Sequence, residues 1–333
     1  MTRDPLIDRR LGPWRISARL GSGGAGLVYR AHDITTGEAV ALKILQSRWA
    51  DNGRVRKRFV REGMILREVR HPGVPRFIEL RRLQSTLVLV QTLAPGEPLD
   101  AILKREPTVH ARRCVPWFLS LLEVLSAVHA AGIIHRDVKP QNLIIGPGRV
   151  TLIDFGLARM LGRSRLTLRG KTVGTPHYLS AEQACGERVD ARTDVYSVGV
   201  TLFQTLTGRL PFDNADRREL FKAILTEQVP SPNAREPIID PRLEGIVLKA
   251  LARDPEQRYQ SAAEMAEALR GWIASRHTRR IKRARALVRR RRKTRTRAVR
   301  KLRAQATRRV RRRTWLGRLL SKLPFLSRFS QAA

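Results

Sequence analysis

Short apolar runs separated by turn residues make up the beginning of the chain. Runs rich in β-branched and aromatic residues, bounded by glycine-containing turns, predict β-strands. We expect strands over residues 14–20, 27–32, 39–45 and 87–90. Before the last of these, a charged segment with apolar residues at helical spacing predicts a helix over residues 55–70, which His71-Pro72-Gly73 would end.

Apolar residues recur at helical spacing in the second part of the chain. This spacing predicts helices over residues 117–131, 193–207, 243–251 and 262–273. Loops and short strands are expected after the first of these, as far as Asp154. A β-rich first part followed by a helical second part predicts two lobes with a cleft between them.

The length and charge of the chain indicate two physically different parts. Its 333 residues leave room for one large domain or two modest ones with a sizeable core. The formal net charge is +37, but residues 274–333 hold 24 Lys and Arg and no Asp or Glu. The first 273 residues therefore carry 42 basic and 29 acidic side chains. A mildly basic body precedes an extremely basic tail.

Cysteine content and hydropathy predict the cellular compartment. Two cysteines cannot form a disulfide framework, and the start of the chain lacks the apolar run of a signal peptide. We therefore expect a cytoplasmic protein. No stretch reaches the length of about 18 apolar residues that a membrane-spanning helix requires, so we expect no transmembrane segment.

A glycine-rich turn between the first two predicted strands is a candidate phosphate site. Gly21, Gly23 and Gly26 precede Val28. Glycines permit tight turns and let backbone N–H groups approach phosphate oxygens. The same spacing marks dinucleotide-binding folds, but there a helix follows the glycines, whereas here a strand follows. A purely structural hairpin is the alternative interpretation.

Lys43 is a charged residue at the end of a predicted apolar strand. Its side chain could hold phosphate oxygens, and Glu62 on the following predicted helix is the candidate partner. The alternatives are a lysine that extends to water from an edge strand and a glutamate on a solvated surface.

The strongest chemical signal is the segment His135-Arg136-Asp137-Val138-Lys139-Pro140-Gln141-Asn142. A carboxylate, an ammonium and an amide within six residues suit one task, which is to orient a hydroxyl, neutralise a migrating phosphoryl group and bind a metal. Asp154 follows twelve residues after Asn142, at the end of an apolar strand and before Phe155-Gly156. Mg²⁺ prefers oxygen ligands, which Asn142 and Asp154 would supply.

Together these motifs resemble the protein-kinase family, in particular the bacterial Hanks-type serine/threonine kinases. The resemblance covers residues 14–272 and implies an α+β, bilobal fold. The small β-rich N-lobe is expected over residues 14–92 and the larger helical C-lobe over 96–273. Residues 1–13 would form an N-terminal extension, and residues 274–333 a basic tail that is mostly disordered or helical.

The resemblance also implies roles for individual residues. Lys43 would contact the α- and β-phosphates of ATP and pair with Glu62, while Asp137 would orient the substrate hydroxyl and Lys139 would meet the γ-phosphate. Asn142 and Asp154 would hold Mg²⁺, with Mn²⁺ as an alternative. The residues expected to contact the nucleotide are Gly21, Gly23, Gly26, Val28, Ala41, Lys43, Thr92, Ala94 and Leu143. The residues expected to support the site are Asp194 beneath the catalytic loop and Glu182, which would pair with Arg258.

Other positions bear on specificity and control. Lys139-Pro140 and Gly174-Thr175 resemble serine/threonine rather than tyrosine kinases. Arg136 implies a positive pocket for a phosphate on the activation segment, with Thr167 as the first candidate and Thr172 and Ser164 next; ordinary polar loop residues are the alternative. Three departures from the family pattern are polar Gln91 behind the adenine site, Thr92 in place of the common hinge glutamate, and Ser180 and Ala181 in place of Ala-Pro before Glu182.

The basic tail leaves three interpretations open. Residues 276–313 are too charged to form a core and could bind nucleic acid by neutralising phosphates. The segment 314–329 contains apolar residues at helical spacing, as on a helix that binds an anionic membrane surface. These residues are Trp315, Leu316, Leu319, Leu320 and Leu323. A solvated arm is the third interpretation.

We therefore expect an active serine/threonine kinase that transfers the γ-phosphate of Mg-ATP to proteins and autophosphorylates its activation segment. It would be cytoplasmic, with the inner membrane face as a site of peripheral attachment. The alternatives are a pseudokinase scaffold, a nucleic-acid- or membrane-binding protein whose tail is the working part, and a small-molecule phosphotransferase of related fold.

Overall fold

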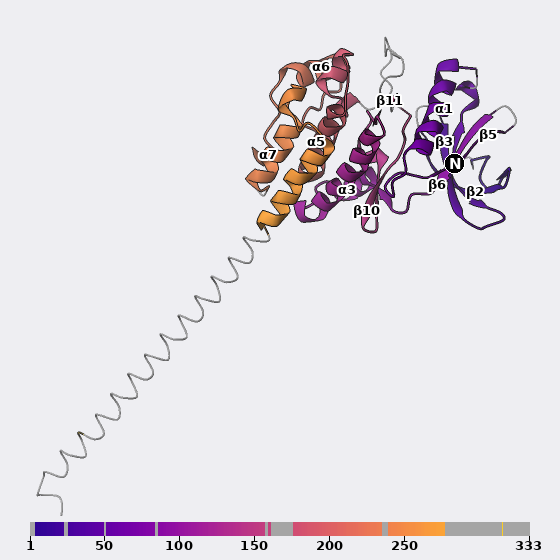
Figure 1. Cartoon of the computed structure of the whole chain (residues 1–333), viewed down its shortest axis with the longest axis horizontal. Coiled ribbons are helices and arrows are strands. Elements are labelled where there is room, and N and C mark those ends of the chain that lie inside the picture. The colour runs from indigo at the N-terminus through magenta and orange to yellow at the C-terminus, as the bar shows by residue number, and fades with distance from the viewer. Residues whose placement is uncertain are drawn as a thin grey trace, which may run out of the picture. The chain divides into compact units, whose positions relative to one another are not determined.

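The computed structural model describes residues 4–22, 26–49, 51–83, 86–156, 159–160, 176–234, 239–276 and 315. The chain divides into two units, Met1–Trp272 and Ile273–Ala333. The first unit contains a β-rich lobe and a helical lobe, as the sequence predicts (Figure 1). Among the described residues, no helix combines the length and the apolar character needed to cross a bilayer.

The N-lobe is built on one antiparallel sheet with the strand order β1-β2-β3-β4-β6-β5. Its strands are β1 (Arg10–Leu11), β2 (Trp14–Ser22), β3 (Gly26–Asp33), β4 (Ala39–Leu45), β5 (Phe77–Leu83) and β6 (Thr86–Thr92). The four predicted strands are confirmed as β2, β3, β4 and β6. β5 was not predicted because its side chains are half-buried or exposed and include Arg81 and Arg82, so that it lacks the apolar alternation of a strand with one buried face.

Helix α1 (Gly53–Glu68) packs against β5 and positions Glu62. It begins two residues before the predicted start because the Asn52 side chain accepts hydrogen bonds from the N–H groups of Arg54 and Val55. Phe59, Glu62, Gly63, Ile65 and Leu66 are its buried residues, and they recur every three or four positions. The spacing therefore places one face of α1, with Glu62 on it, toward the interior.

The C-lobe is mainly helical. Its helices are α2 (Leu99–Arg105), α3 (Ala111–Ala130), α4 (Ala181–Cys185), α5 (Arg192–Thr207), α6 (Arg217–Thr226), α7 (Pro241–Ala250) and a helix over residues 262–276. Single 3₁₀ turns form η1 (Ser47–Trp49) in the N-lobe and η2 (Pro140–Asn142), η3 (Pro176–Tyr178), η4 (Pro232–Ala234) and η5 (Pro255–Gln257) in the C-lobe. Helix α3 begins six residues before its predicted start, because the His110 side chain caps it there. Pro116 lies inside the helix, although proline normally interrupts helices. Helices α2, α4 and α6 were not predicted.

Short strands lie between the lobes. β7 (Glu97–Pro98), β9 (Leu143–Gly146) and β10 (Arg149–Leu152) form a small antiparallel sheet, and β8 (Ile133–Ile134) pairs with β11 (Arg159–Met160). Residues 135–142, which the resemblance implies are the catalytic loop, lie between β8 and β9, and Asp154 follows β10. These strands therefore fix both ends of the two segments that carry the predicted chemistry.

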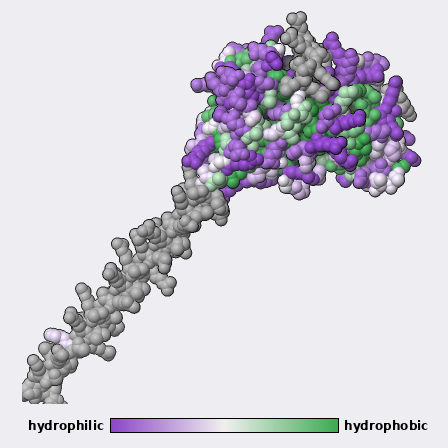
Figure 2. Space-filling model, viewed as in Figure 1, coloured by the Kyte–Doolittle hydropathy of each residue, from purple (hydrophilic) through white to green (hydrophobic). Residues whose placement is uncertain are grey.

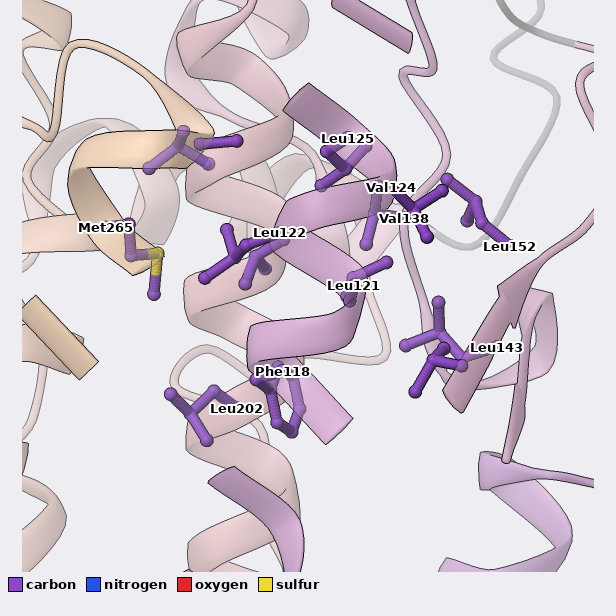
Figure 3. Packing of buried hydrophobic residues seen from close by; sticks show 14 of the residues in the cluster. Phe118, Leu121, Leu122, Val124, Leu125, Val138, Leu143, Leu152, Leu202 and Met265 are labelled. Carbon is purple, nitrogen blue, oxygen red and sulfur yellow. The ribbon is translucent and has the colours of Figure 1, made fainter. Parts of the chain in front are cut away.

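Two hydrophobic clusters lie on the two faces of the N-lobe sheet, and a third packs α6 within the C-lobe. The larger contains Phe59 and Leu66 of α1, Phe155, and most of the inward faces of α3 and α5, so it runs through both lobes. In Figure 3, side chains of α3 lie between Met265 on one side and Leu143 and Leu152 on the other. The smaller cluster covers the other face of the N-lobe sheet, where Leu6, Ile7 and Leu11 pack against it. Residues 4–13 are thus folded onto the N-lobe.

Because these clusters bury most of the large apolar side chains, the surface should be mainly hydrophilic. Hydrophilic residues cover most of the face of the first unit that Figure 2 shows, with apolar residues in smaller patches.

Gly96 is required by the backbone path between β6 and β7. Its φ is +125°, and a Cβ there would lie 2.2 Å from the carbonyl oxygen of Ile145. We expect Gly96→Ala to lower the free energy of unfolding by about 2–4 kcal/mol, because both the conformation and the space exclude a side chain. Urea denaturation of the full chain measures this change.

Gly245 supplies the matched control for Gly96. It lies inside α7, and a Cβ there would have no atom within 4 Å. Gly245→Ala should leave the free energy of unfolding unchanged or raise it by up to about 1 kcal/mol, because alanine favours the helix. Equal denaturation midpoints for the two variants would contradict the role assigned to Gly96.

Candidate active site

Pairing in the N-lobe sheet brings the predicted nucleotide-contacting residues onto one face. Gly21 lies opposite Val28, and Val28 lies opposite Lys43. Directly paired residues of antiparallel strands project to the same side. Ala41 precedes Lys43 by two positions, so it lies on this face as well, opposite Gln91. Gly23 lies outside the described residues.

Gly26 has a packing reason that the sequence analysis did not find. A Cβ at this position would lie 2.8 Å from the carbonyl oxygen of Ile44. Because the obstacle is backbone, it cannot move aside as a flexible side chain could. A glycine here lets β3 begin close against β4, whereas a Cβ at Gly21 would meet no atom within 4 Å.

Lys43 is held by two carboxylates from different parts of the chain. Its Nζ donates hydrogen bonds to Glu62 Oε1 and Oε2 at 2.7 Å and to Asp154 Oδ1 at 2.8 Å. The Lys43 and Glu62 side chains are buried, and that of Asp154 is one-third exposed. The three groups are brought together from β4, α1 and the segment after β10.

The cluster contains one cation for two anions, which decides where a proton resides. Burial opposes the charge of Lys43, but Asp154 and Glu62 outweigh it and raise the pKa of the lysine. Burial would raise the pKa of Asp154, yet the charge and hydrogen bond of Lys43 lower it to about 2. Burial, together with the Asp154 charge, raises the pKa of Glu62 despite Lys43. Lys43 and Asp154 are therefore charged, and Glu62 is the carboxylate that takes up a proton most readily.

Asp194 organises the backbone of the catalytic-loop motif from α5. Its carboxylate accepts hydrogen bonds from the N–H groups of His135 (2.9 Å) and Arg136 (2.7 Å), and His129 Nε2 lies 2.8 Å away. Burial would raise the pKa of Asp194, but the His129 contact and the Arg136 N–H help to lower it. Arg136 has a φ of +68°, a conformation that non-glycine residues rarely adopt. The buried carboxylate therefore holds this strained backbone in place.

Asp137 is oriented by two neighbours of its own loop. Lys139 Nζ donates to both carboxylate oxygens at 2.9 and 2.8 Å, and Asn142 Nδ2 donates to the Asp137 carbonyl oxygen at 2.7 Å and to Oδ2 at 3.0 Å. Burial raises the pKa of Asp137, and Lys139 opposes this shift. The Asn142 carbonyl oxygen accepts from the N–H of Ile153 at 2.9 Å, which links this loop to the segment that carries Asp154.

The donor set of the site suits a magnesium ion bound with phosphates. Within the described residues, neither the side-chain oxygen of Asn142 nor Asp154 Oδ2 accepts a hydrogen bond. Both are hard oxygen ligands. The same described ranges hold no cluster of three or more His, Cys, Asp and Glu side chains that could bind a metal ion. A metal here would therefore need further ligands from a nucleotide or from water.

One predicted nucleotide contact needs correction. Leu143 packs in the large hydrophobic cluster next to α3 and is 1% exposed, so its side chain is not open to a ligand (Figure 3). The next residue, Ile144, lies on the opposite face of β9 because side chains alternate along a strand. At Thr92, the N–H donates to the Arg76 carbonyl oxygen at 3.0 Å and the hydroxyl accepts from the Arg76 N–H at 2.9 Å. Ala94 is half-buried.

Glu182 and Arg258 form a buried ion pair in the C-lobe. Arg258 Nη1 and Nη2 donate to the two carboxylate oxygens at 2.8 Å, and the Thr193 hydroxyl donates to Oε1 at 2.7 Å. Burial would raise the pKa of Glu182, but Arg258 lowers it below its usual range. The pair is the arrangement that the resemblance implied for these two residues.

Gln183 is a supporting residue that the sequence analysis missed. Its side chain completes a capping box with Ser180 at the start of α4. Its Nε2 also donates to the Arg136 carbonyl oxygen at 3.2 Å, which joins α4 to the catalytic loop. The spacing Ser-x-x-Gln was the available signal. Ser180 thus begins this helix where the family pattern has alanine followed by proline.

The three candidate phosphorylation positions, Thr167, Thr172 and Ser164, lie outside the described residues. Their relation to Arg136 stays a prediction.

A sequence model of the family described as "Protein kinase domain" matches residues 14–270. The chain belongs to the protein kinase family. The prediction of a bacterial Hanks-type serine/threonine kinase is confirmed by its relatives. The chain is 35% identical to serine/threonine-protein kinase pkn3 of Myxococcus xanthus over 78% of its length, and 37% identical to pkn2 of the same organism, again over 78%. Identity to PrkC of Bacillus subtilis is 32%, again over 78%.

The matched relatives are longer proteins. The aligned regions span 51% of pkn3, 32% of pkn2 and 40% of PrkC. The likeness thus lies in the kinase domain, and the relatives' names favour the active-kinase interpretation over the pseudokinase.

The Glu182–Arg258 pair generates a stability prediction. The Arg258 side chain has no exposed surface, so Glu182→Ala would leave a buried, uncompensated charge. We expect this variant to lose about 3–5 kcal/mol of unfolding free energy. Urea denaturation at constant pH measures the loss.

Glu256 provides the control for this prediction. It contacts Arg192 at 2.8 Å, but its side chain is 74% exposed. Glu256→Ala should cost at most about 1 kcal/mol. A loss for Glu182→Ala no larger than for Glu256→Ala would show that the buried pair does not stabilise the C-lobe.

Proposed function

We propose that this chain is an active serine/threonine protein kinase, which transfers the γ-phosphate of ATP to hydroxyl groups of proteins. The observation that carries the proposal is the joint placement of two charged groups. Lys43 is fixed between Glu62 and Asp154, and Asp137 is fixed by Lys139 and Asn142. A degenerate kinase fold would have no need to keep every member of this set. The serine/threonine kinase names of the relatives support the same conclusion.

The nucleotide would lie against the inner face of the N-lobe sheet. Gly21, Gly23 and Gly26 would cover its phosphates, with Val28 and Ala41 above the adenine and Ile144, in place of Leu143, below it. Backbone groups between Thr92 and Ala94 would bind the adenine edge. Lys43 would hold the α- and β-phosphates.

Asn142 and Asp154 would hold Mg²⁺, for which Mn²⁺ is the alternative. When bound, the ion would neutralise charge on the phosphate oxygens. The low pKa of Asp154, about 2, keeps this ligand ionised across the physiological range.

Catalysis would depend on positioning. Asp137 would accept a hydrogen bond from the substrate hydroxyl, align its oxygen for in-line attack and take its proton as the new P–O bond forms. A carboxylate is a weak base for an alcohol, so alignment contributes more than proton abstraction. Lys139, which lies against Asp137, would turn its charge toward the transferred phosphoryl group, and Lys43 would remain on the phosphates of the leaving group.

Regulation and specificity are further parts of the proposal. Phosphorylation of the segment that contains Ser164, Thr167 and Thr172 would place a doubly charged group near Arg136, which suits an arginine side chain. The Gly174-Thr175 pair favours serine and threonine over tyrosine as acceptors, and the segment 172–182 favours proteins over small molecules as substrates.

The basic tail would attach the kinase to an anionic surface. We propose the cytoplasmic face of the membrane as that surface, because residues 314–329 place apolar side chains at helical spacing beside a strongly basic stretch. Trp315, the described residue of this segment, is helical and exposed. Nucleic acid is the alternative ligand.

The kinase is tested by incubating the purified chain with labelled Mg-ATP and a generic basic protein. Label on Ser or Thr is expected. Asp137→Asn should reduce transfer by about 100- to 10,000-fold, because a neutral amide oxygen aligns the hydroxyl less strongly than a carboxylate and cannot take its proton, while ATP binding is retained. Asp33→Asn is the matched control, since Asp33 is the last residue of β3 and its carboxylate accepts hydrogen bonds from the β3–β4 turn, and it should transfer like the parent. ATP binding without transfer by the parent would favour a pseudokinase scaffold.

Mapping the label in the chain itself would identify the phosphorylated position among Ser164, Thr167 and Thr172.

The tail is tested by comparing the parent with a chain that ends at residue 314. Removing Trp315 and the residues after it should abolish co-sedimentation with vesicles of anionic lipid, because the apolar anchor is lost. Retention of a labelled RNA on a filter should be nearly unchanged, since 21 of the 24 tail cations remain. Vesicle binding that survives the truncation would exclude the apolar anchor.

A further inference from the structure

Residues 4–13 precede the region that matches the kinase family, yet they are folded onto the N-lobe. The Asp8 N–H donates to the Ile16 carbonyl oxygen at 2.9 Å, and the Ile16 N–H donates to the Arg9 carbonyl oxygen at 3.0 Å. β1 then pairs with β2. Leu6, Ile7 and Leu11 pack against the hydrophobic cluster on the sheet face away from Lys43. This segment is therefore anchored by both backbone and apolar contacts.

Asp4, near the start of this segment, reaches two strands at once. The Tyr29 hydroxyl of β3 donates to Asp4 Oδ2 at 3.1 Å, and Arg19 Nη1 of β2 lies 3.6 Å from the same oxygen. The Leu6 N–H donates to Asp4 Oδ1 at 3.1 Å, which fixes the carboxylate. Arg19 and Tyr29 face each other in the β2–β3 register. We call Asp4, Arg19 and Tyr29 the Asp4 clip.

The hydroxyl of Tyr29 makes the clip specific. The Tyr29 residue is fully buried, and within the described part of the chain Asp4 is the acceptor for its hydroxyl. Burial first, and then the contact with Asp4, raise the pKa of Tyr29 to about 12, so the hydroxyl stays a donor at neutral pH. A buried hydroxyl without an acceptor is costly, whereas an exposed pair such as Asp4–Arg19 contributes little by itself.

The position of the clip along β2 and β3 matters for the glycine-rich turn. The β2–β3 ladder is irregular between Arg19 and Gly21, where exposed Leu20 is the extra residue of a bulge. Bulges bend and twist a strand pair locally. The clip joins the two strands at the last pair before this bulge, and Gly21 and Gly26 lie on the strands beyond it. It therefore limits how far the glycine-bearing end can swing about the bulge.

We propose that Asp4 is a positioning residue for nucleotide binding, which holds the glycine-rich hairpin in the conformation that covers the phosphates of ATP. The inference rests on the proposed kinase function for its kinetic readout. The apparent affinity of a ligand falls in proportion to the fraction of protein in the binding-competent conformation. Loss of the clip would lower that fraction. The reacting groups, Asp137 and Lys139, lie in the other lobe and would be unaffected.

The test compares Asp4→Ala and Tyr29→Phe with the parent in the full chain. Each variant should raise the KM for Mg-ATP about tenfold, the size expected for one hydrogen bond to a charged group, with little change in kcat. Asp4→Asn keeps an acceptor for Tyr29 and should show a smaller rise. Because both single variants remove the same hydrogen bond, the KM of the double variant for Mg-ATP should be no higher than that of either single variant.

A stability control separates positioning from general damage to the N-lobe. Leu83 packs against the same hydrophobic cluster from β5, at the other edge of the sheet. Leu83→Ala should lower Tm but leave the KM for ATP unchanged. An equal rise in KM for Leu83→Ala, or an unchanged KM in Asp4→Ala and Tyr29→Phe, would overturn the proposal.

Direct binding of Mg-ATP to the same variants, measured by calorimetry, separates this inference from the proposed function. If the parent binds ATP but transfers no phosphate, the kinase proposal fails, and the Asp4 clip is then judged by Kd. A Kd about ten times that of the parent in Asp4→Ala would support the clip, and an unchanged Kd would reject it.

Discussion

Competition between two carboxylates for one buried ammonium is the constraint on which the site depends. Lys43 satisfies both Glu62 and Asp154 only when α1 lies against the N-lobe sheet and the segment after β10 lies beneath it. A buried cation without these partners would be strongly unfavourable. The interaction thus reports the relative position of three elements that the chain brings together from distant places. Since the pair of anions exceeds the single cation, the site has a surplus of negative charge that a metal ion would neutralise.

In the other lobe, a second buried carboxylate also fixes the position of functional groups. The Asp194 carboxylate oxygens accept hydrogen bonds from the backbone N–H groups of His135 and Arg136. They thereby fix a main-chain conformation that would otherwise be unfavourable. Asp137 is the next residue, so its position depends on the backbone conformation of Arg136. The side chains that would meet a substrate are thus placed by residues that do not touch it. Gln183 of α4 also supports this loop, because its side-chain amide donates a hydrogen bond to the Arg136 carbonyl oxygen.

The sequence was informative where chemistry imposes residue types and less so where packing decides. The partnership of Lys43 with Glu62, and that of Glu182 with Arg258, could be predicted because the family resemblance assigns a role to each residue. Strand β5 and helix α6 were not predicted because charged side chains interrupt their apolar patterns, for example Arg81 and Arg82 in β5 and Lys222 in α6. Leu143 was assigned to the nucleotide although its side chain packs in the core and Ile144 lies on the opposite face, since a shift of one residue reverses the face of a strand. The backbone obstacle at Gly26 cannot be read from glycine spacing at all.

The two hydrophobic clusters have a consequence for how the molecule comes apart. Phe59 and Leu66 of α1 share a continuous cluster with α3 and α5, whereas Trp14, Tyr29 and Leu42 belong to a separate cluster on the other face of the sheet. Regions that share a core tend to open together as one cooperative unit. The natural line of partial unfolding therefore follows the plane of the N-lobe sheet, so that α1 exchanges its amide hydrogens in step with the C-lobe.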